Sequence, residues 1–234
     1  MALFRAAKNE KIVGEASADY IYFHETVIPL IKDISPDAKI LILLRNPVDR
    51  AFSAYRHMLR DGRETLSFEE ALERESERMS TNYEFIWYYK DVGLYERQVR
   101  AYITAFGEHN VKVCLHDDLD ENPGGVMRDI FRFLGVDENF TPDFSRRLNV
   151  SSVPKSESFE SFLTDYEHPI KKVLRPVLLS AIGKENTESL VNYFKERNQL
   201  RMKSKTRKLL IEAYREDILK LEQLINRDLS VWLR

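Results

Sequence analysis

The sequence is short of cysteine and of long apolar runs, and each shortage excludes a class of protein. Its one cysteine, Cys114, cannot form an internal disulfide, so a small secreted fold built on disulfides is excluded. No apolar stretch is long enough to cross a bilayer or to form the core of a signal peptide. We therefore expect a cytoplasmic protein without a membrane segment, in which Cys114 is a buried structural thiol.

The sequence also lacks net charge of either sign. It has 36 Lys and Arg residues against 38 Asp and Glu residues, which gives a formal net charge of -2 over 234 residues. No overall positive field would attract nucleic acid or an anionic membrane, so neither is expected as a partner. The five histidines are scattered without a metal-ligand spacing, so no metal is expected. Any anion that the protein binds must be held by a local cluster.

Apolar periodicity predicts that strands and helices alternate over the first two thirds of the chain. Branched apolar runs predict strands at Lys39–Leu44 and Val111–Leu115, and Lys11–Val13 forms a shorter candidate. The continuous run at Lys39–Leu44 is typical of a strand that is covered on both faces in a parallel sheet. The pattern predicts an α/β fold: a three-layer parallel sheet with a helical C-terminal cap. We expect one domain over residues 1–234, with 1–156 as the α/β portion and 157–234 as its helical part.

Helical periodicity and end signals place the helices between and after these strands. Ser67 and Glu70 have the spacing of a capping box, and Gly135 follows an apolar run as a helix-ending glycine would. The expected helices are Ala18–Ile34, Pro47–Leu59, one that starts after Ser67, Leu94–Phe106, Asn122–Leu134, His168–Ile182, Glu188–Phe194 and Lys205–Ile225.

The strongest candidate site lies where the strand Lys39–Leu44 passes into the next helix. Ligands of parallel α/β folds bind at the carboxyl ends of the strands, and Arg45 stands at that end. Asn46 is a good N-cap, and Pro47 suits the first helical position. Ser53 and His57 fall on the polar face of this helix, and the guanidinium of Arg45 can bind a phosphate through two hydrogen bonds. An ordinary solvated helix face is the alternative.

The unbroken run from Leu43 to Tyr55 resembles the motif with which sulfotransferases bind the 3′-phosphate of their donor, 3′-phosphoadenosine 5′-phosphosulfate. This resemblance implies that Arg45 and Ser53 contact the phosphate. Other stretches are similar to landmarks of the same family, from near Lys11 to the end of the chain: Gly14–Tyr20, which borders the acceptor cleft in that family, Gly93–Tyr95, Phe133–Val136 and Asp228–Leu233. His57 matches a histidine near the acceptor site of heparan-type members.

A basic loop carries a second part of the resemblance. The segment Arg146–Ser156 is similar to the family loop that closes over the nucleotide, which implies that Arg147 and Lys155 reach its phosphates. The implied co-substrate is 3′-phosphoadenosine 5′-phosphosulfate, the product is adenosine 3′,5′-bisphosphate, and no metal is involved. The implied acceptor is a hydroxyl or amine of a carbohydrate or small metabolite.

One family landmark has no counterpart in the sequence. Sulfotransferases grip the sulfate-bearing end of the donor with a Walker-like loop of Lys, Gly and Thr or Ser, and none of the eight glycines stands in such a loop. We therefore expect the first strand and the donor loop of the family fold to be missing, with the chain N-terminally truncated relative to the family. A sheet without its first strand exposes polar backbone groups and apolar surface, which a homo-oligomer could cover.

Two residues are candidates for the general base of sulfuryl transfer. Glu15, in the Gly14–Tyr20 stretch, and His57 could each take a proton from the acceptor. The alternatives are a capping carboxylate for Glu15 and a solvated helix residue for His57. The leading expectation is a sulfotransferase. Its rival is an inactive or truncated member that binds the nucleotide or a partner without turnover.

Overall fold

The structure is a computed structural model, and it describes residues 7–144 and 200–234. These residues form two compact units. The first unit contains the described residues 7–48, 92–144 and 210–234, and the second contains 49–91 and 200–209. The predicted boundary at residue 156 falls outside the described residues, so the single-domain organisation stays a prediction.

The centre of the first unit is a pair of parallel strands. Strand β1 (Ile40–Leu44) pairs with β2 (Val111–Leu115) in a register that joins Ile40 to Val111 and Leu44 to Leu115. Because the strands are parallel, their carboxyl ends lie at one edge of the sheet. Both strands were predicted from their apolar runs, and both predictions are confirmed.

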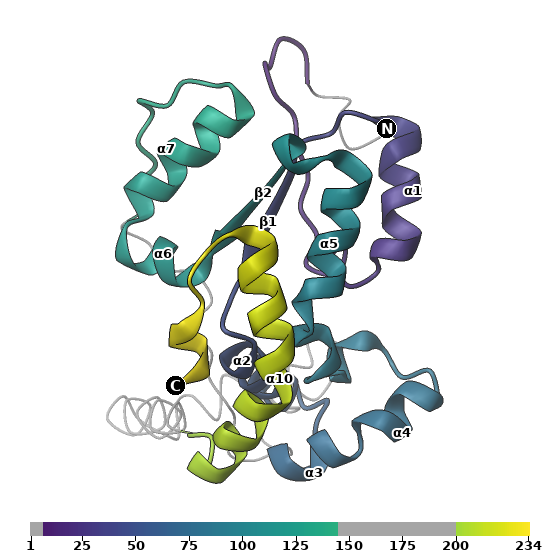
Figure 1. The fold of residues 1–234 in the computed structure, drawn as a ribbon. Coiled ribbons are helices and arrows are strands. Elements are labelled where there is room, and N and C mark those ends of the chain that lie inside the picture. The colour runs from purple at the N-terminus through teal and green to yellow at the C-terminus, as the bar shows by residue number, and fades with distance from the viewer. Residues whose placement is uncertain (1–6, 145–199) are drawn as a thin grey trace, which may run out of the picture. The chain divides into compact units, whose positions relative to one another are not determined.

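Helices lie on both sides of this pair, as Figure 1 shows. Helix α5 (Tyr95–Phe106) packs against both strands, and α1 (His24–Ile34) packs against α5. Helix α7 (Pro123–Leu134) packs against β2 on the other side, after the short helix α6 (His116–Glu121). Parallel strands between two layers of helices confirm the predicted three-layer α/β class.

The two faces of β1 differ in exposure, which corrects one prediction. Ile42 and Leu44 are buried on the face that points toward the core, but Leu41 and Leu43 are 45% and 52% exposed. The apolar run therefore does not mark a strand covered on both faces. A continuous run reports only that each side chain is apolar, whereas the neighbours on each face decide its burial.

The last long helix closes the core of the first unit. Helix α10 (Ser204–Ile225) starts in the second unit and continues into the first, where Tyr214, Ile218 and Leu221 are buried. Tyr214 lies so close to Gly93 that a Cβ there would stand 2.7 Å from the tyrosine hydroxyl oxygen. Only glycine leaves room at this position, just before α5.

A carboxylate of α10 also caps α5. Leu94, at the N-cap position of α5, offers no capping side chain. Asp217 supplies one instead, because its carboxylate accepts hydrogen bonds from the N–H groups of Tyr95 (2.8 Å) and Glu96 (3.3 Å). Burial raises the pKa of Asp217 despite these two bonds.

The second unit is built around aromatic rings and the buried ion pair of Arg78 with Glu64. It contains most of helix α2 (Pro47–Arg60), followed by α3 (Phe68–Glu73) and α4 (Glu75–Ser80). The rings of Tyr55, Phe68 and Tyr89 pack against one another with centroids 5.0 to 6.2 Å apart. The predicted capping box at the start of α3 is confirmed, since Ser67 and Glu70 bond each other's backbone N–H groups.

Other secondary-structure predictions are confirmed or corrected in detail. The helices at α2, α5, α7 and α10 are confirmed within one or two residues, and Gly135 ends α7 in the left-handed conformation at φ 73°. The strand at Lys11–Val13 is wrong, because these residues have no regular secondary structure. The first helix begins at His24 rather than Ala18. It follows a turn in which the backbone oxygen of Asp19 accepts hydrogen bonds from the N–H groups of Tyr22 and Phe23. The helices expected at 168–182 and 188–194 fall outside the described residues.

Candidate active site

Arg45 follows directly on β1, at the edge of the sheet where both parallel strands end. Its side chain is half-buried. Across the described part of the chain, the Arg45 guanidinium makes no hydrogen bond or ion pair. An arginine without a partner at a strand end is available to an anion.

The start of α2 supports Arg45 but leaves few N–H groups for a ligand. Asn46 is 6% exposed, and its side-chain oxygen accepts the N–H of Val48 at 3.0 Å. Pro47, the first residue of α2, has no N–H to donate. Because the cap and the proline satisfy the beginning of this helix, most of the attraction for an anion at this point must come from the Arg45 side chain.

Two further candidates lie on α2 within the second unit. Ser53 is half-buried and its hydroxyl has no hydrogen-bond partner in the described part of the chain. His57 is 52% exposed, and its Nε2 lies 3.2 Å from a carboxylate oxygen of Asp61, which directly follows the end of the helix. A surface pair of this kind adds little to stability, so it neither requires nor excludes a chemical role for His57.

Glu15 lies in a stretch of the first unit that has no regular secondary structure, and it is exposed. The Glu15 carboxylate acts on the Tyr20 hydroxyl and raises the pKa of that phenol. The backbone oxygen of Tyr20 accepts a hydrogen bond from the Tyr102 hydroxyl at 2.7 Å. Sequence reasoning missed this pair of tyrosines. The only local signal for it was that Glu15 and Tyr20 stand in the same family-like stretch.

The remaining candidates, Arg147 and Lys155, lie outside the described residues, and their predicted contacts with the nucleotide stay predictions. Residues 7–144 and 200–234 contain neither a metal-binding group of side chains nor a membrane-spanning helix. No three His, Cys, Asp or Glu side chains there are grouped closely enough to hold a metal ion. No helix in those ranges is both long and apolar enough to cross a membrane.

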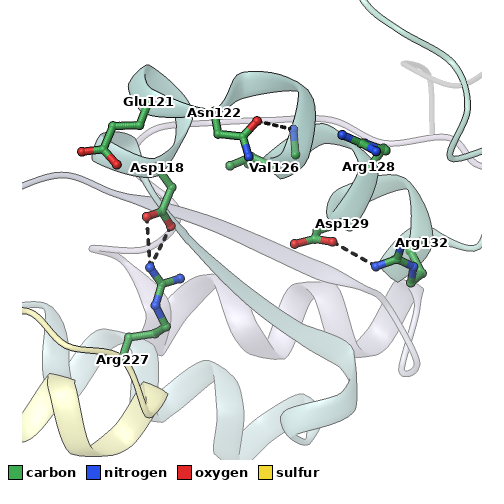
Figure 2. A pocket seen from close by; sticks show the side chains of 9 residues that line it. Asp118, Glu121, Asn122, Val126, Arg128, Asp129, Arg132 and Arg227 are labelled. Atoms are coloured by element: carbon green, nitrogen blue, oxygen red, sulfur yellow. Dashed lines mark hydrogen bonds and ion pairs between the residues drawn. The ribbon is translucent and has the colours of Figure 1, made fainter.

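A hollow of about 380 Å³ lies between α6 and α7 in the first unit, and Figure 2 shows the side chains around it. Its charges largely compensate one another. Arg227 donates to both carboxylate oxygens of Asp118 at 3.0 Å, and Arg132 donates to Asp129 at the same distance. Asp117 accepts the indole N–H of Trp232 at 2.9 Å. These bonds hold the C-terminal segment on α6, which indicates a structural role for the acidic start of α6.

Comparison with known proteins agrees with the motif at Arg45. The family model described as "Sulfotransferase family" matches residues 6–142, which is more than half of the chain. The chain is also similar to the crystal structure of a sulfotransferase from Alicyclobacillus acidocaldarius. The two share 37% sequence identity with a TM-score of 0.73, over 100% of this chain and 72% of the other. Among curated proteins, none matches the chain.

The parallel α/β fold with these two matches defines the class of protein. The chain belongs to the sulfotransferase family, as the resemblance of the stretch around Arg45 predicted. Members of this family are enzymes that transfer a sulfuryl group to an acceptor.

Proposed function

We propose that this protein transfers a sulfuryl group from 3′-phosphoadenosine 5′-phosphosulfate to a hydroxyl or amine of a carbohydrate or small metabolite. The observation that carries this proposal is the unpaired guanidinium of Arg45 at the carboxyl end of β1. A nucleotide 3′-phosphate would supply the anion that this side chain lacks among the described residues. The motif adds the hydroxyl of Ser53 as a second contact to the same phosphate.

Sulfuryl transfer requires mainly that the protein positions the two substrates and stabilises the charge that develops. The acceptor oxygen or nitrogen forms a bond to sulfur while the bond from sulfur to the bridging phosphate oxygen breaks. The electron pair of the broken S–O bond stays on the leaving phosphate of adenosine 3′,5′-bisphosphate. A base takes the proton that the acceptor loses. Positive charge near the phosphates favours the transition state, because negative charge grows there as the bond breaks.

Glu15 is the base that we assign. It belongs to the same unit as Arg45 and is exposed, so an acceptor can reach it. His57 is the second candidate from sequence, and its Nε2 is already engaged by Asp61. Replacing each in turn, as Glu15→Gln and His57→Asn, separates the two by which variant loses transfer.

Calorimetry with adenosine 3′,5′-bisphosphate tests the nucleotide site on the full chain. Arg45→Ala should weaken binding by about 1.5–3 kcal/mol, roughly 10- to 150-fold, because a charge-assisted hydrogen-bonded pair is lost. Arg128→Ala is the matched control, since Arg128 lines the hollow beside α7 and has no role in the proposed site. Ser53→Ala should weaken binding by a smaller factor.

Transfer is measured separately with ³⁵S-labelled donor and a panel of amino sugars, sugars and small phenols. Binding that depends on Arg45 together with transfer supports the proposal. Binding without transfer to any acceptor favours the rival function, a nucleotide-binding family member without turnover. If the parent chain binds no nucleotide, or if Arg128→Ala weakens binding as much as Arg45→Ala, the assignment to Arg45 is wrong.

A further inference from the structure

The carboxyl end of β2 lies beside the carboxyl end of β1, where Arg45 stands. The two strands are parallel, and Leu44 of β1 is the register partner of Leu115 of β2. Each of these leucines is the last residue of its strand, and neighbouring strands lie about 4.8 Å apart. The next residues along the chain, Arg45 and His116, therefore leave the sheet side by side at the edge where ligands of parallel α/β folds bind.

The imidazole of His116 is oriented by a carboxylate and keeps one nitrogen available. Nδ1 of His116 lies 3.1 Å from a carboxylate oxygen of Asp120, one turn later in α6. Within residues 7–144 and 200–234, no hydrogen bond or ion pair engages Nε2 of His116, and this side chain is 39% exposed. The pair with Asp120 holds Nδ1 toward the protein, so Nε2 is the nitrogen that a ligand can reach.

The carboxylates that follow His116 directly are bonded to the C-terminal segment. Arg227 donates to both carboxylate oxygens of Asp118 at 3.0 Å, as Figure 2 shows. Asp117 accepts the indole N–H of Trp232 at 2.9 Å. The ion pair offsets one of the negative charges at the start of α6, which would otherwise repel an anion. An anion at the strand ends therefore meets carboxylates that are already bonded.

From this arrangement we infer that His116 is a second contact to the phosphate that Arg45 binds, donating from Nε2–H to a phosphate oxygen. The inference rests on the proposed function, which puts the 3′-phosphate of adenosine 3′,5′-bisphosphate at Arg45. A phosphate next to the ring favours the form in which both ring nitrogens carry a proton, so Nδ1–H can stay with Asp120 while Nε2–H donates. Donors from two neighbouring strand ends fix the position of the anion better than one flexible side chain does.

Calorimetry with adenosine 3′,5′-bisphosphate on the full chain tests the contact. His116→Asn keeps a donor near the position of Nδ1 and removes Nε2, so it should weaken binding about tenfold through loss of a charge-assisted hydrogen bond. His116→Gln places an amide N–H near the position of Nε2 and should bind more tightly than His116→Asn. His109→Asn is the matched control, because His109 is exposed just before β2, at the opposite end of the strand. It should bind like the parent.

A second nucleotide shows which group His116 contacts. Adenosine 5′-monophosphate lacks the 3′-phosphate, so the parent chain and His116→Asn should bind it with equal affinity. Thermal unfolding without nucleotide checks the fold, and the variant should unfold at about the temperature of the parent, since only an exposed pair with Asp120 changes. An equal loss for both nucleotides would overturn the inference, because the contact would then not be made to the 3′-phosphate.

The outcomes separate the two proposals. If the parent chain binds no adenosine 3′,5′-bisphosphate, the proposed nucleotide site fails and the role of His116 fails with it. If Arg45→Ala weakens binding while His116→Asn binds like the parent, or loses no more than His109→Asn, the role of His116 is wrong and the proposed function stands. A loss in His116→Asn that is confined to the bisphosphate and is partly restored in His116→Gln supports both.

Discussion

Two arginines, one in each unit, show opposite ways of placing a cation in this protein. In the second unit, Arg78 donates to both carboxylate oxygens of Glu64, at 2.6 and 3.1 Å, and the two side chains are only 12% and 2% exposed. In the first unit, Arg45 is half-buried at a strand end and has no partner among the described residues. The partner of Arg78 is part of the fold, which indicates a structural cation. Arg45 makes no such pair within residues 7–144 and 200–234, which fits a side chain that is available to a ligand.

The network around Arg78 supplies the largest expected effect. Glu64 also accepts the Tyr89 hydroxyl at 2.9 Å and lies next to the ring cluster of the second unit. Arg78→Ala would leave the Glu64 carboxylate buried without its cation, which should cost about 3–5 kcal/mol of unfolding free energy. Urea unfolding followed by circular dichroism measures it.

The control for this variant is Arg74→Ala, one turn earlier in the chain. Arg74 pairs with Glu77 at 3.0 Å, but both side chains are at least 60% exposed, so its loss should change stability by about 0.5 kcal/mol or less. Equal losses for Arg74→Ala and Arg78→Ala would remove the distinction between buried and exposed pairs on which the comparison depends.

Acid should narrow the difference between the parent and Arg78→Ala. Burial alone would raise the pKa of Glu64, but the bonds from Arg78, from the N–H of Leu66 and from Tyr89 outweigh it and hold that pKa below its usual range. A carboxylate with a lowered folded pKa contributes stability that is complete above the unfolded pKa of about 4.3 and is lost as the pH falls through the folded value.

The variant lacks Arg78 and so has less of this stability to lose. Unfolding free energies measured from pH 7 down to pH 3 should therefore converge for the parent and Arg78→Ala. Curves that stay parallel over this range would show that Glu64 is not the group that Arg78 supports.

The sequence indicated a candidate site at Arg45, which stays a prediction, but gave no sign of the network at Arg78. The difference lies in the sequence separation of the residues involved. Arg45 was recognisable because strand, arginine, cap and helix follow one another directly in the chain, so the pattern is local. Glu64 and Arg78 are 14 residues apart, and Asp217 caps α5 from 121 and 122 residues away. No periodicity reports such contacts, because only the folded chain brings their partners together.

The exposure of β1 was also predicted wrongly, because contacts between distant parts of the chain decide which side chains are covered. The apolar run of β1 predicted burial on both faces, yet Leu41 and Leu43 are about half exposed. The effect of Glu15 on Tyr20 is an intermediate case, since both residues stand in one short stretch but lack a helix or strand that would predict their interaction. Local order was therefore predictable where a regular element imposes it, and side-chain pairing was not.

The smallest effect on stability is expected at Arg45 itself. Arg45→Ala removes no hydrogen bond or ion pair that the described structure contains, so its unfolding free energy without ligand should stay within about 0.5 kcal/mol of the parent. Adenosine 3′,5′-bisphosphate should stabilise the parent by mass action, and the variant should lose most of that gain. Thermal unfolding with and without the nucleotide measures both quantities on the same samples. Since an arginine that stabilised the fold would lower the transition even without nucleotide, an equal loss in both conditions would place Arg45 with Arg78 as a structural cation.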